Sequence, residues 1–377
     1  MILRGAEVLF PEGFGTEEVC LDEGMIADDA SGREIDLTGY RILPGIVDLH
    51  GDGFERHLAP RRGAMRDLGV GLQSVDAELG ANGITTAFLA QFFSWEGGMR
   101  GPEFAERLCA ALQGAQGLLT DMRLQLRLET HMLDEYARFE ALVAKSGTKY
   151  VVFNDHVPHA ALAKGKRPPR LTGQALKSGR SPEAHLALLQ RLHDHADQVP
   201  DAVSRLARRL RAARVLLGSH DDHTAEARQH WAQAGVAVAE FPETREAASA
   251  AHCDQTPVVL GAPNVVRGGS HKGNVSATDL LAEGIGDAIA SDYHYPAPKQ
   301  AVQRLVRDGV MGFEEAWSLV SRRPAQIAGL ADRGEIAAGK RADLVVLDPR
   351  TDRIGATICA GRISFMAGDV AARFVGE

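Results

Sequence analysis

Short apolar runs alternate along this chain with longer segments that have a helical pattern. The short runs end in polar residues, which is typical of buried strands that stop in turns. The alternation therefore predicts strands and helices in turn. The strands are expected at residues 46–49, 84–89, 123–128, 150–154, 215–219, 236–241, 257–261 and 287–291. The helices are expected at residues 72–81, 102–112, 134–145, 202–213, 224–234, 244–251 and 277–283.

Eight strands with helices between them predict an α/β fold, a (β/α)8 TIM-type barrel. Residues 1–41 and the tail contain further short strands, which we expect to form a small β-sandwich domain built from both termini. The predicted boundaries are 1–44 together with 334–377 for the small domain and 45–333 for the barrel. The chain has 377 residues, enough for a barrel of about 250 residues and a smaller domain.

Composition narrows the class of protein. The formal net charge of −8 argues against nonspecific nucleic-acid binding, but a local basic pocket can still bind a small anionic substrate. The four cysteines are scattered, which favours reduced thiols in a cytoplasmic protein. We expect neither a signal peptide nor membrane association, because no apolar run approaches the ~18 residues of a membrane span. The sequence leaves a homo-oligomer open.

Polar residues collect where the expected strands end, and in such barrels the active site lies at the carboxyl ends of the strands. The first strand is entered through Pro44-Gly45 and is followed by His50 and Asp52. Side chains alternate along a strand, so these two point to the same side and can hold one metal ion. The eighth strand again ends in a carboxylate. The candidate metal ligands are His50, Asp52, Glu129, His156, His220 and Asp292.

These ligands suit a divalent metal, zinc first, with manganese or iron as alternatives, in one or two ions that Glu129 could bridge. A metal ion lowers the pKa of water, and we expect Asp292 to bind metal and to shuttle the proton. His223 is the alternative catalytic residue. His193 and His195 lie in a helical stretch among charges and are interpreted as surface residues.

Several runs carry a resemblance to a known family. Leu43-Pro44-Gly45-Ile46-Val47-Asp48-Leu49-His50 resembles the first strand of the amidohydrolase superfamily, and residues 334–345 resemble its return to the small β domain. Further motifs are Asp155-His156-Val157-Pro158, Ser219-His220-Asp221-Asp222, Glu240-Phe241-Pro242, Gly261-Ala262-Pro263-Asn264 and residues 267–274. With them the chain resembles, more narrowly, the PhnM group, which serves phosphonate utilisation. This resemblance implies a metal-dependent hydrolase that cleaves α-D-ribose 1-methylphosphonate 5-triphosphate and releases diphosphate.

Two departures from the superfamily pattern keep other functions open. No histidine ends the sixth strand, although Glu240 stands near that position, and residues 91–96 are expected to form an aromatic loop over the barrel mouth. The alternatives are an amidohydrolase or deaminase acting on a non-peptide C–N bond and a catalytically inactive binding protein. A triphosphate requires several cationic partners. The candidate substrate-binding residues are Arg56, Arg61, Arg62, Arg267 and Lys272.

A basic insertion follows the fourth strand. Residues 164–180 contain six basic residues and no acidic one, in a chain that is acidic overall. Such a segment can close on an anionic substrate and exclude water, or it can be a solvated, disordered insertion. Arginine suits phosphate because its planar fork pairs with two oxygens at once. The basic residues are Lys164, Lys166, Arg167, Arg170, Lys177 and Arg180.

Overall fold

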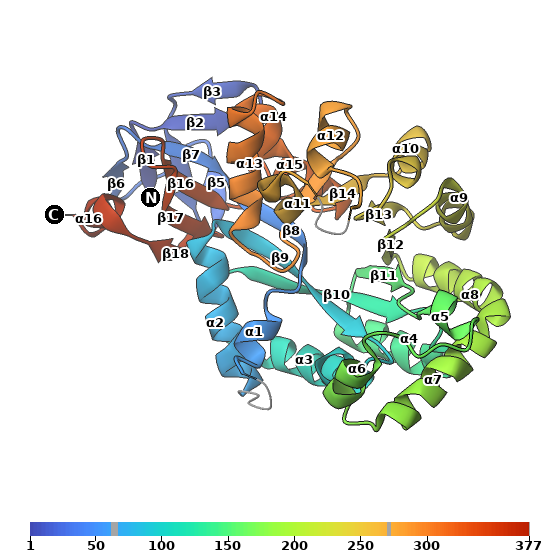
Figure 1. Ribbon diagram of the computed structural model, residues 1–377. Helices are drawn as coiled ribbons and strands as arrows, with labels where there is room; N and C mark the ends of the chain where they lie inside the picture. Colours follow the sequence, from blue (N-terminus) through green and yellow to red (C-terminus); the bar gives the residue numbers. More distant parts are fainter. Residues whose placement is uncertain (62–66, 270–272, 377) are drawn as a thin grey trace. The chain divides into compact units, whose positions relative to one another are not determined.

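The computed structural model describes residues 1–61, 67–269 and 273–376 (Figure 1). Arg62 and Lys272, two of the expected substrate-binding residues, lie outside the described residues. The chain divides into two compact units. Unit 1 comprises Met1–Leu89, Ala115–Arg123 and Val259–Glu377, and unit 2 comprises Ala90–Gly114 and Leu124–Val258. The domain boundaries expected at residues 44 and 334 stay a prediction.

Eight strands form one parallel sheet in chain order, which confirms the expected α/β barrel fold. In unit 1 the first and last of these strands meet, because the N–H of Asp292 donates to the carbonyl of His50 at 2.9 Å and the N–H of Asp52 donates to the carbonyl of Asp292 at 2.9 Å. These bonds nearly close the sheet on itself. The strands are β8 (Ile46–Gly51), β9 (Ile84–Phe93), β10 (Asp121–Glu129), β11 (Tyr150–Asn154), β12 (Leu216–His220), β13 (Val238–Glu240), β14 (Val258–Gly261) and β15 (Ala288–Ala290).

Strands from both termini form two further sheets in unit 1, as the sequence predicts. A six-stranded sheet has the order β18-β17-β16-β7-β2-β3, and a four-stranded sheet has the order β5-β4-β1-β6. Both contribute to one apolar core, in which Leu3, Ile35, Ile42 and Leu344 are at most 1% exposed. Burying such a side chain contributes about 1.5–3 kcal/mol. The strands are β1 (Ile2–Arg4), β2 (Glu7–Phe10), β3 (Gly13–Gly15), β4 (Val19–Asp22), β5 (Met25–Ala27), β6 (Glu34–Asp36), β7 (Arg41–Pro44), β16 (Leu344–Asp348), β17 (Arg353–Cys359) and β18 (Arg362–Met366).

The helices of unit 1 belong to two groups. Most of them follow the barrel strands of this unit in the chain, and the last one, amphipathic, covers the terminal sheets with Val370 and Phe374 buried. They are α1 (Glu55–Leu58), α2 (Leu68–Ala81), α11 (Ala262–Arg267), α12 (Ala277–Ala282), α13 (Ala297–Arg307), α14 (Phe313–Ser318), α15 (Arg322–Ile327) and α16 (Gly368–Val375).

The helices of unit 2 begin with side-chain caps at three places. The Oγ1 atom of Thr224 accepts the N–H of Ala227 at 3.1 Å, which confirms the helix start expected there, and Ser181 and Thr244 cap in the same way. No helix in the described ranges combines the length and apolar character that a membrane span requires. The helices of unit 2 are α3 (Pro102–Gly114), α4 (Tyr136–Ser146), α5 (His159–Leu162), α6 (Leu171–Ser178), α7 (Pro182–Asp194), α8 (Val199–Ala212), α9 (Ala225–Ala234) and α10 (Arg245–Cys253).

The insertion after β11 is a folded part of unit 2. Its helices α5, α6 and α7 contribute Leu162, Leu171 and Leu189 to a buried cluster around Trp95. The Arg180 guanidinium also donates to the Trp95 carbonyl at 2.7 Å. Residues 91–93 belong to β9 and Trp95 is 2% exposed, so the aromatic loop expected over the mouth is wrong: this stretch is strand and core.

Candidate metal centre and active site

Three of the predicted metal ligands lie in unit 1, where β8 and β15 end. The imidazole of His50 is fully buried, and the backbone bonds described above hold Asp292 beside the segment from His50 to Asp52. Asp292 has a φ of +55°, a left-handed conformation that costs a non-glycine residue about 1–3 kcal/mol. Such conformations persist where the surrounding structure enforces them and are frequent at functional sites. Unit 1 thus brings the backbones of His50, Asp52 and Asp292 together.

The buried carboxylate of Asp48, in β8, connects this strand to Ser291, the residue that follows β15. Asp48 is 0% exposed and accepts hydrogen bonds from the N–H of Ser291 at 2.8 Å and from its hydroxyl at 2.5 Å. Burial raises the pKa of Asp48. The hydrogen bonds from Ser291 and the charge of His50 act to lower this pKa, but burial outweighs them. A Cβ atom at Gly51 would lie 2.7 Å from both Asp48 and Tyr295, so only glycine fits between His50 and Asp52.

Two of the expected substrate-binding arginines contact one tyrosine in unit 1. The Arg56 guanidinium donates to the carbonyl of Tyr293 at 3.1 Å and pairs with Glu78, and the Arg267 guanidinium donates to the Tyr293 hydroxyl. Tyr293 is 46% exposed. Arg61 is exposed. Arg56 and Arg267 therefore place positive charge beside the residue that follows Asp292.

The predicted ligands Glu129 and His156 form a pair in unit 2. Glu129, the last residue of β10, is fully buried and its Oε1 atom lies 2.5 Å from Nδ1 of His156. Its Oε2 atom accepts from the N–H of His156 and from the indole of Trp95, both at 3.1 Å. Burial alone would raise the pKa of Glu129, but the charge and hydrogen bonds of His156 outweigh it and lower that pKa. For His156, burial acts to lower the pKa, but the charge and the hydrogen bond of Glu129 outweigh burial, so the pKa of His156 is raised.

His220, the last residue of β12, lies beside this pair in unit 2. Its Nδ1 atom is 3.2 Å from Oδ1 of Asp221, and its Nε2 atom is 3.0 Å from the guanidinium of Arg127. The other oxygen of Asp221 is 3.9 Å from Nε2 of His156. Ligand atoms of His156, His220 and Asp221 all lie within 4.8 Å of one another. Asp221 belongs to the motif Ser219-His220-Asp221-Asp222 but is not among the metal ligands predicted from the sequence.

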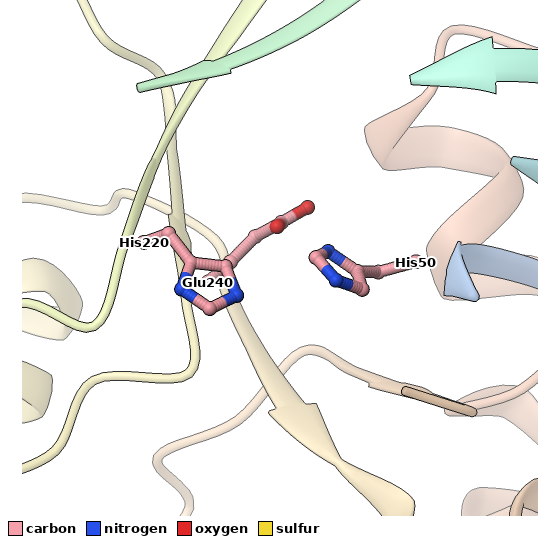
Figure 2. A group of neighbouring side chains, drawn as sticks. All are labelled: His50, His220 and Glu240. Atoms are coloured by element: carbon pink, nitrogen blue, oxygen red, sulfur yellow. The ribbon is translucent and has the colours of Figure 1, made fainter. Parts of the chain in front are cut away.

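Glu240 occupies the end of β13, where the superfamily pattern expects histidine. Glu240 is the register partner of His220 in the parallel pairing of β12 and β13. Figure 2 shows these two side chains on their neighbouring strands. The figure also labels His50, which belongs to β8 of unit 1. Gln125 donates to Oε1 of Glu240 at 2.7 Å and the Tyr150 hydroxyl donates to it at 2.5 Å. These donors stabilise a fully buried carboxylate next to His220.

The alternative catalytic residue, His223, lies at the surface of unit 2. Its side chain is 68% exposed and its Nδ1 atom is 3.0 Å from a carboxylate oxygen of Glu243. Thr244 donates to its carbonyl at 2.7 Å. Its catalytic role stays a prediction.

The buried Arg127 is not among the site residues predicted from the sequence. It is 3% exposed, lies over the ring of Phe92 with its central carbon 3.9 Å from the ring centre, and contacts His220. The signal was present in β10, where Gln125, Arg127 and Glu129 alternate with leucines and so share one face of the strand. This alternation of polar residues along a buried strand is the signal that indicates a functional layer.

The residues present fit a divalent cation. Imidazole nitrogens and carboxylate oxygens are the donors that zinc prefers, and unit 2 supplies them from His156, His220 and Asp221 within reach of one ion. Glu129 adds a buried carboxylate whose burial would be costly without positive partners. Unit 1 supplies one more imidazole and two carboxylates at the ends of β8 and β15.

Comparison with known proteins identifies the family. Residues 71–365 match the model of the amidohydrolase family. The chain belongs to the amidohydrolase family. It is accordingly a hydrolase, and the family usually binds divalent metals. An α-D-ribose 1-methylphosphonate 5-triphosphate diphosphatase of Escherichia coli K12 is 35% identical over 335 residues, which cover 85% of this chain and 86% of that protein.

Solved structures support the fold. A crystal structure of an amidohydrolase is similar with a TM-score of 0.66 and 14% identity, over 98% of this chain and 99% of that chain. An Xaa-Pro dipeptidase is similar with a TM-score of 0.67 and 14% identity, over 97% and 99% of the two chains. An N-acetylglucosamine-6-phosphate deacetylase of Pasteurella multocida has a TM-score of 0.61 at 13% identity, over 96% and 98%. At these identities the likeness shows the barrel fold alone.

Proposed function

We propose that this chain is a metal-dependent diphosphatase that hydrolyses α-D-ribose 1-methylphosphonate 5-triphosphate and releases diphosphate. The observation that carries the proposal is the 35% identity to the E. coli diphosphatase over most of both chains. The strand-end carboxylates and imidazoles, with arginines beside Tyr293, supply the chemistry such a reaction needs. The free cysteines Cys20, Cys109, Cys253 and Cys359 are compatible with the cytoplasmic location that we propose for it.

We propose zinc as the metal, held by residues from the ends of the barrel strands. Each is at or just after the end of its own strand, which is where barrel enzymes carry their active sites. A divalent cation bound there would polarise a phosphoryl oxygen and increase the acidity of water. The proposed ligands are His50, Asp52, Glu129, His156, His220 and Asp292, with Asp221 added from the geometry of unit 2.

The protein's own groups would bind the substrate and move the proton. Arg56 and Arg267 bind phosphate oxygens, because a guanidinium makes charge-assisted hydrogen bonds to them. Water adds to phosphorus, the phosphoanhydride bond to the diphosphate breaks, and the carboxylate of Asp292 takes the proton from the water. The Glu129–His156 pair keeps both of its members oriented.

A comparison of substrates and metals tests the proposal. The purified protein is assayed with the ribose methylphosphonate triphosphate and with N-acetyl and cyclic amide substrates, before and after chelation and zinc repletion. We expect turnover of the triphosphate only, lost on chelation and restored by zinc. Turnover of a C–N substrate in place of the triphosphate would assign the chain to the alternative, an amidohydrolase or deaminase. Undiminished turnover after the bound metal has been removed would refute the metal dependence.

A further inference from the structure

A second cluster of possible metal ligands lies in unit 2 and shares no residue with the proposed active-site ligands. It contains His131 just after β10, Asp155 just after β11 and His159 at the start of α5, with ligand atoms within 4.8 Å of one another. Nδ1 of His131 is 3.4 Å from Oδ1 of Asp155, and Nε2 of His159 is 3.2 Å from Oδ2 of Asp155. Asp155 and His156 are consecutive, yet their side chains take different partners, since His156 pairs with Glu129.

These separations fit ligands around one ion. Zinc–nitrogen and zinc–oxygen bonds of about 2.0–2.1 Å in a tetrahedral arrangement place neighbouring ligand atoms about 3.3–3.4 Å apart. The separations in the cluster, 3.4 Å from His131 to Oδ1 of Asp155 and 3.2 Å from His159 to Oδ2, are close to that value, so each imidazole lies at ligand spacing from one oxygen of the carboxylate. As a hydrogen bond the 3.4 Å separation would be long, because N–H···O bonds are commonest at about 2.9–3.0 Å. Thr130 Oγ1 also lies 3.4 Å from Nδ1 of His131, again a long contact.

A third histidine supplies the partner that metal-bound imidazoles usually have. Nδ1 of His193, on α7, is 2.7 Å from Nδ1 of His159. If Nε2 of His159 binds metal, its Nδ1 carries a proton and donates to His193. A partner of this kind fixes the tautomer and the ring orientation of the ligand. His193 had been interpreted as a surface residue, but it is only partly exposed and packs against His159 with ring centres 5.0 Å apart.

We propose that His131, Asp155 and His159 bind a divalent transition-metal ion, zinc by the nature of its donors, with His193 as the hydrogen-bond acceptor of His159. The imidazole of His131 is only 5% exposed, whereas Asp155 and His159 are 43% and 31% exposed, so an ion can enter from the solvent side. Three protein ligands leave one position of a tetrahedral site for water or a small anion. The ion would connect the ends of β10 and β11 to α5 and, through His193, to α7.

Zinc titration of matched variants tests this site. The full-length protein is stripped with chelator, and zinc is titrated against a chromophoric chelator to give the number of tightly bound equivalents. The test variant is His131→Ala/His159→Ala. The control is His195→Ala, which removes the histidine at the C-cap of α7, two positions from His193, and which is not one of the proposed ligands. We expect the double variant to bind one zinc fewer than the control and the parent.

Two further variants make the result decisive. His193→Ala should keep the number of zinc ions but weaken one of them about 10–100-fold, as loss of a metal-bound histidine's partner does. His156→Ala changes the proposed active site and should leave the cluster's zinc in place. The test compares the numbers of zinc ions that the variants bind. It therefore detects zinc at the cluster even if the proposed active site binds none. Equal zinc numbers in the double variant and the control would overturn the proposal. If the double variant does not fold, parent-like zinc affinity in His193→Ala would overturn it.

Discussion

The indole of Trp95 should control metal binding at Glu129. Glu129 is fully buried and accepts three hydrogen bonds, one of them from the indole N–H of Trp95 at 3.1 Å and two from His156. Trp95→Phe removes that donor and keeps an aromatic ring in the cluster formed with Leu162, Leu171 and Leu189. A hydrogen bond to a charged group contributes about 1.5–3 kcal/mol.

The size of the expected effect follows from that figure. Since about 1.4 kcal/mol is a tenfold change in affinity, the loss corresponds to roughly 10–100-fold weaker metal binding. Partners of metal ligands have effects of the same size when they are removed. The assay is the zinc concentration that restores half of the turnover of the chelated enzyme. We expect it to rise about 10–100-fold for Trp95→Phe.

A matched substitution elsewhere in unit 2 serves as the control. Trp231 stacks on Phe153 with ring centres 5.4 Å apart, so Trp231→Phe makes the same chemical change away from Glu129. We expect the parent zinc requirement for this variant. If Trp95→Phe keeps the parent zinc requirement, or if the control raises it equally, then the indole does not orient Glu129 for metal binding.

Three other substitutions test separate parts of the account. Asp292→Asn should reduce turnover by on the order of 10²–10⁴-fold while circular dichroism stays at the parent spectrum, because a proton-transfer group is lost. Arg167→Ala/Arg170→Ala should raise KM for the triphosphate, with about 1.5–3 kcal/mol for each charged hydrogen bond lost. Arg333→Ala should lower the free energy of unfolding in urea by about 3–5 kcal/mol, because its guanidinium is 4% exposed and pairs with Asp121 at 2.7 Å.

Exposed arginines provide the controls for these variants. Arg205 and Arg208 lie on the exposed face of α8, and their replacement by alanine should leave KM for the triphosphate at the parent value. Arg307 is 69% exposed, and Arg307→Ala should change the free energy of unfolding by less than about 1 kcal/mol. Near-parent turnover of Asp292→Asn would assign the proton transfer elsewhere, with His223 as the next candidate.

The strand ends were predictable because alternation and turn residues are local features of the sequence. The eight strands and the terminal sheets follow from that alternation. Contacts between distant residues were not predictable in this way. Asp48 is held by Ser291, 243 positions away, and neither residue has a local pattern that predicts the contact. Residues 91–96 were predicted to form a loop because the local pattern does not show that the insertion after β11 buries Trp95.

Buried charge was the other source of error. Arginine is usually at the surface, so Arg127 was missed. The structure buries Arg127 against Phe92 and His220, where hydrogen bonds and an aromatic ring compensate for the lost hydration. The basic insertion, residues 164–180, includes helix α6 with Leu171 buried, and its contact with substrate stays a prediction.

The products of one reaction test the central claim most directly. Phosphorus NMR of the purified, zinc-loaded protein with α-D-ribose 1-methylphosphonate 5-triphosphate distinguishes diphosphate from orthophosphate. The account predicts one diphosphate and one α-D-ribose 1-methylphosphonate 5-phosphate for each substrate consumed, with no signal change for Asp292→Asn over the same period. Orthophosphate as the first product, or an unchanged triphosphate spectrum with the zinc-loaded parent protein, would contradict it.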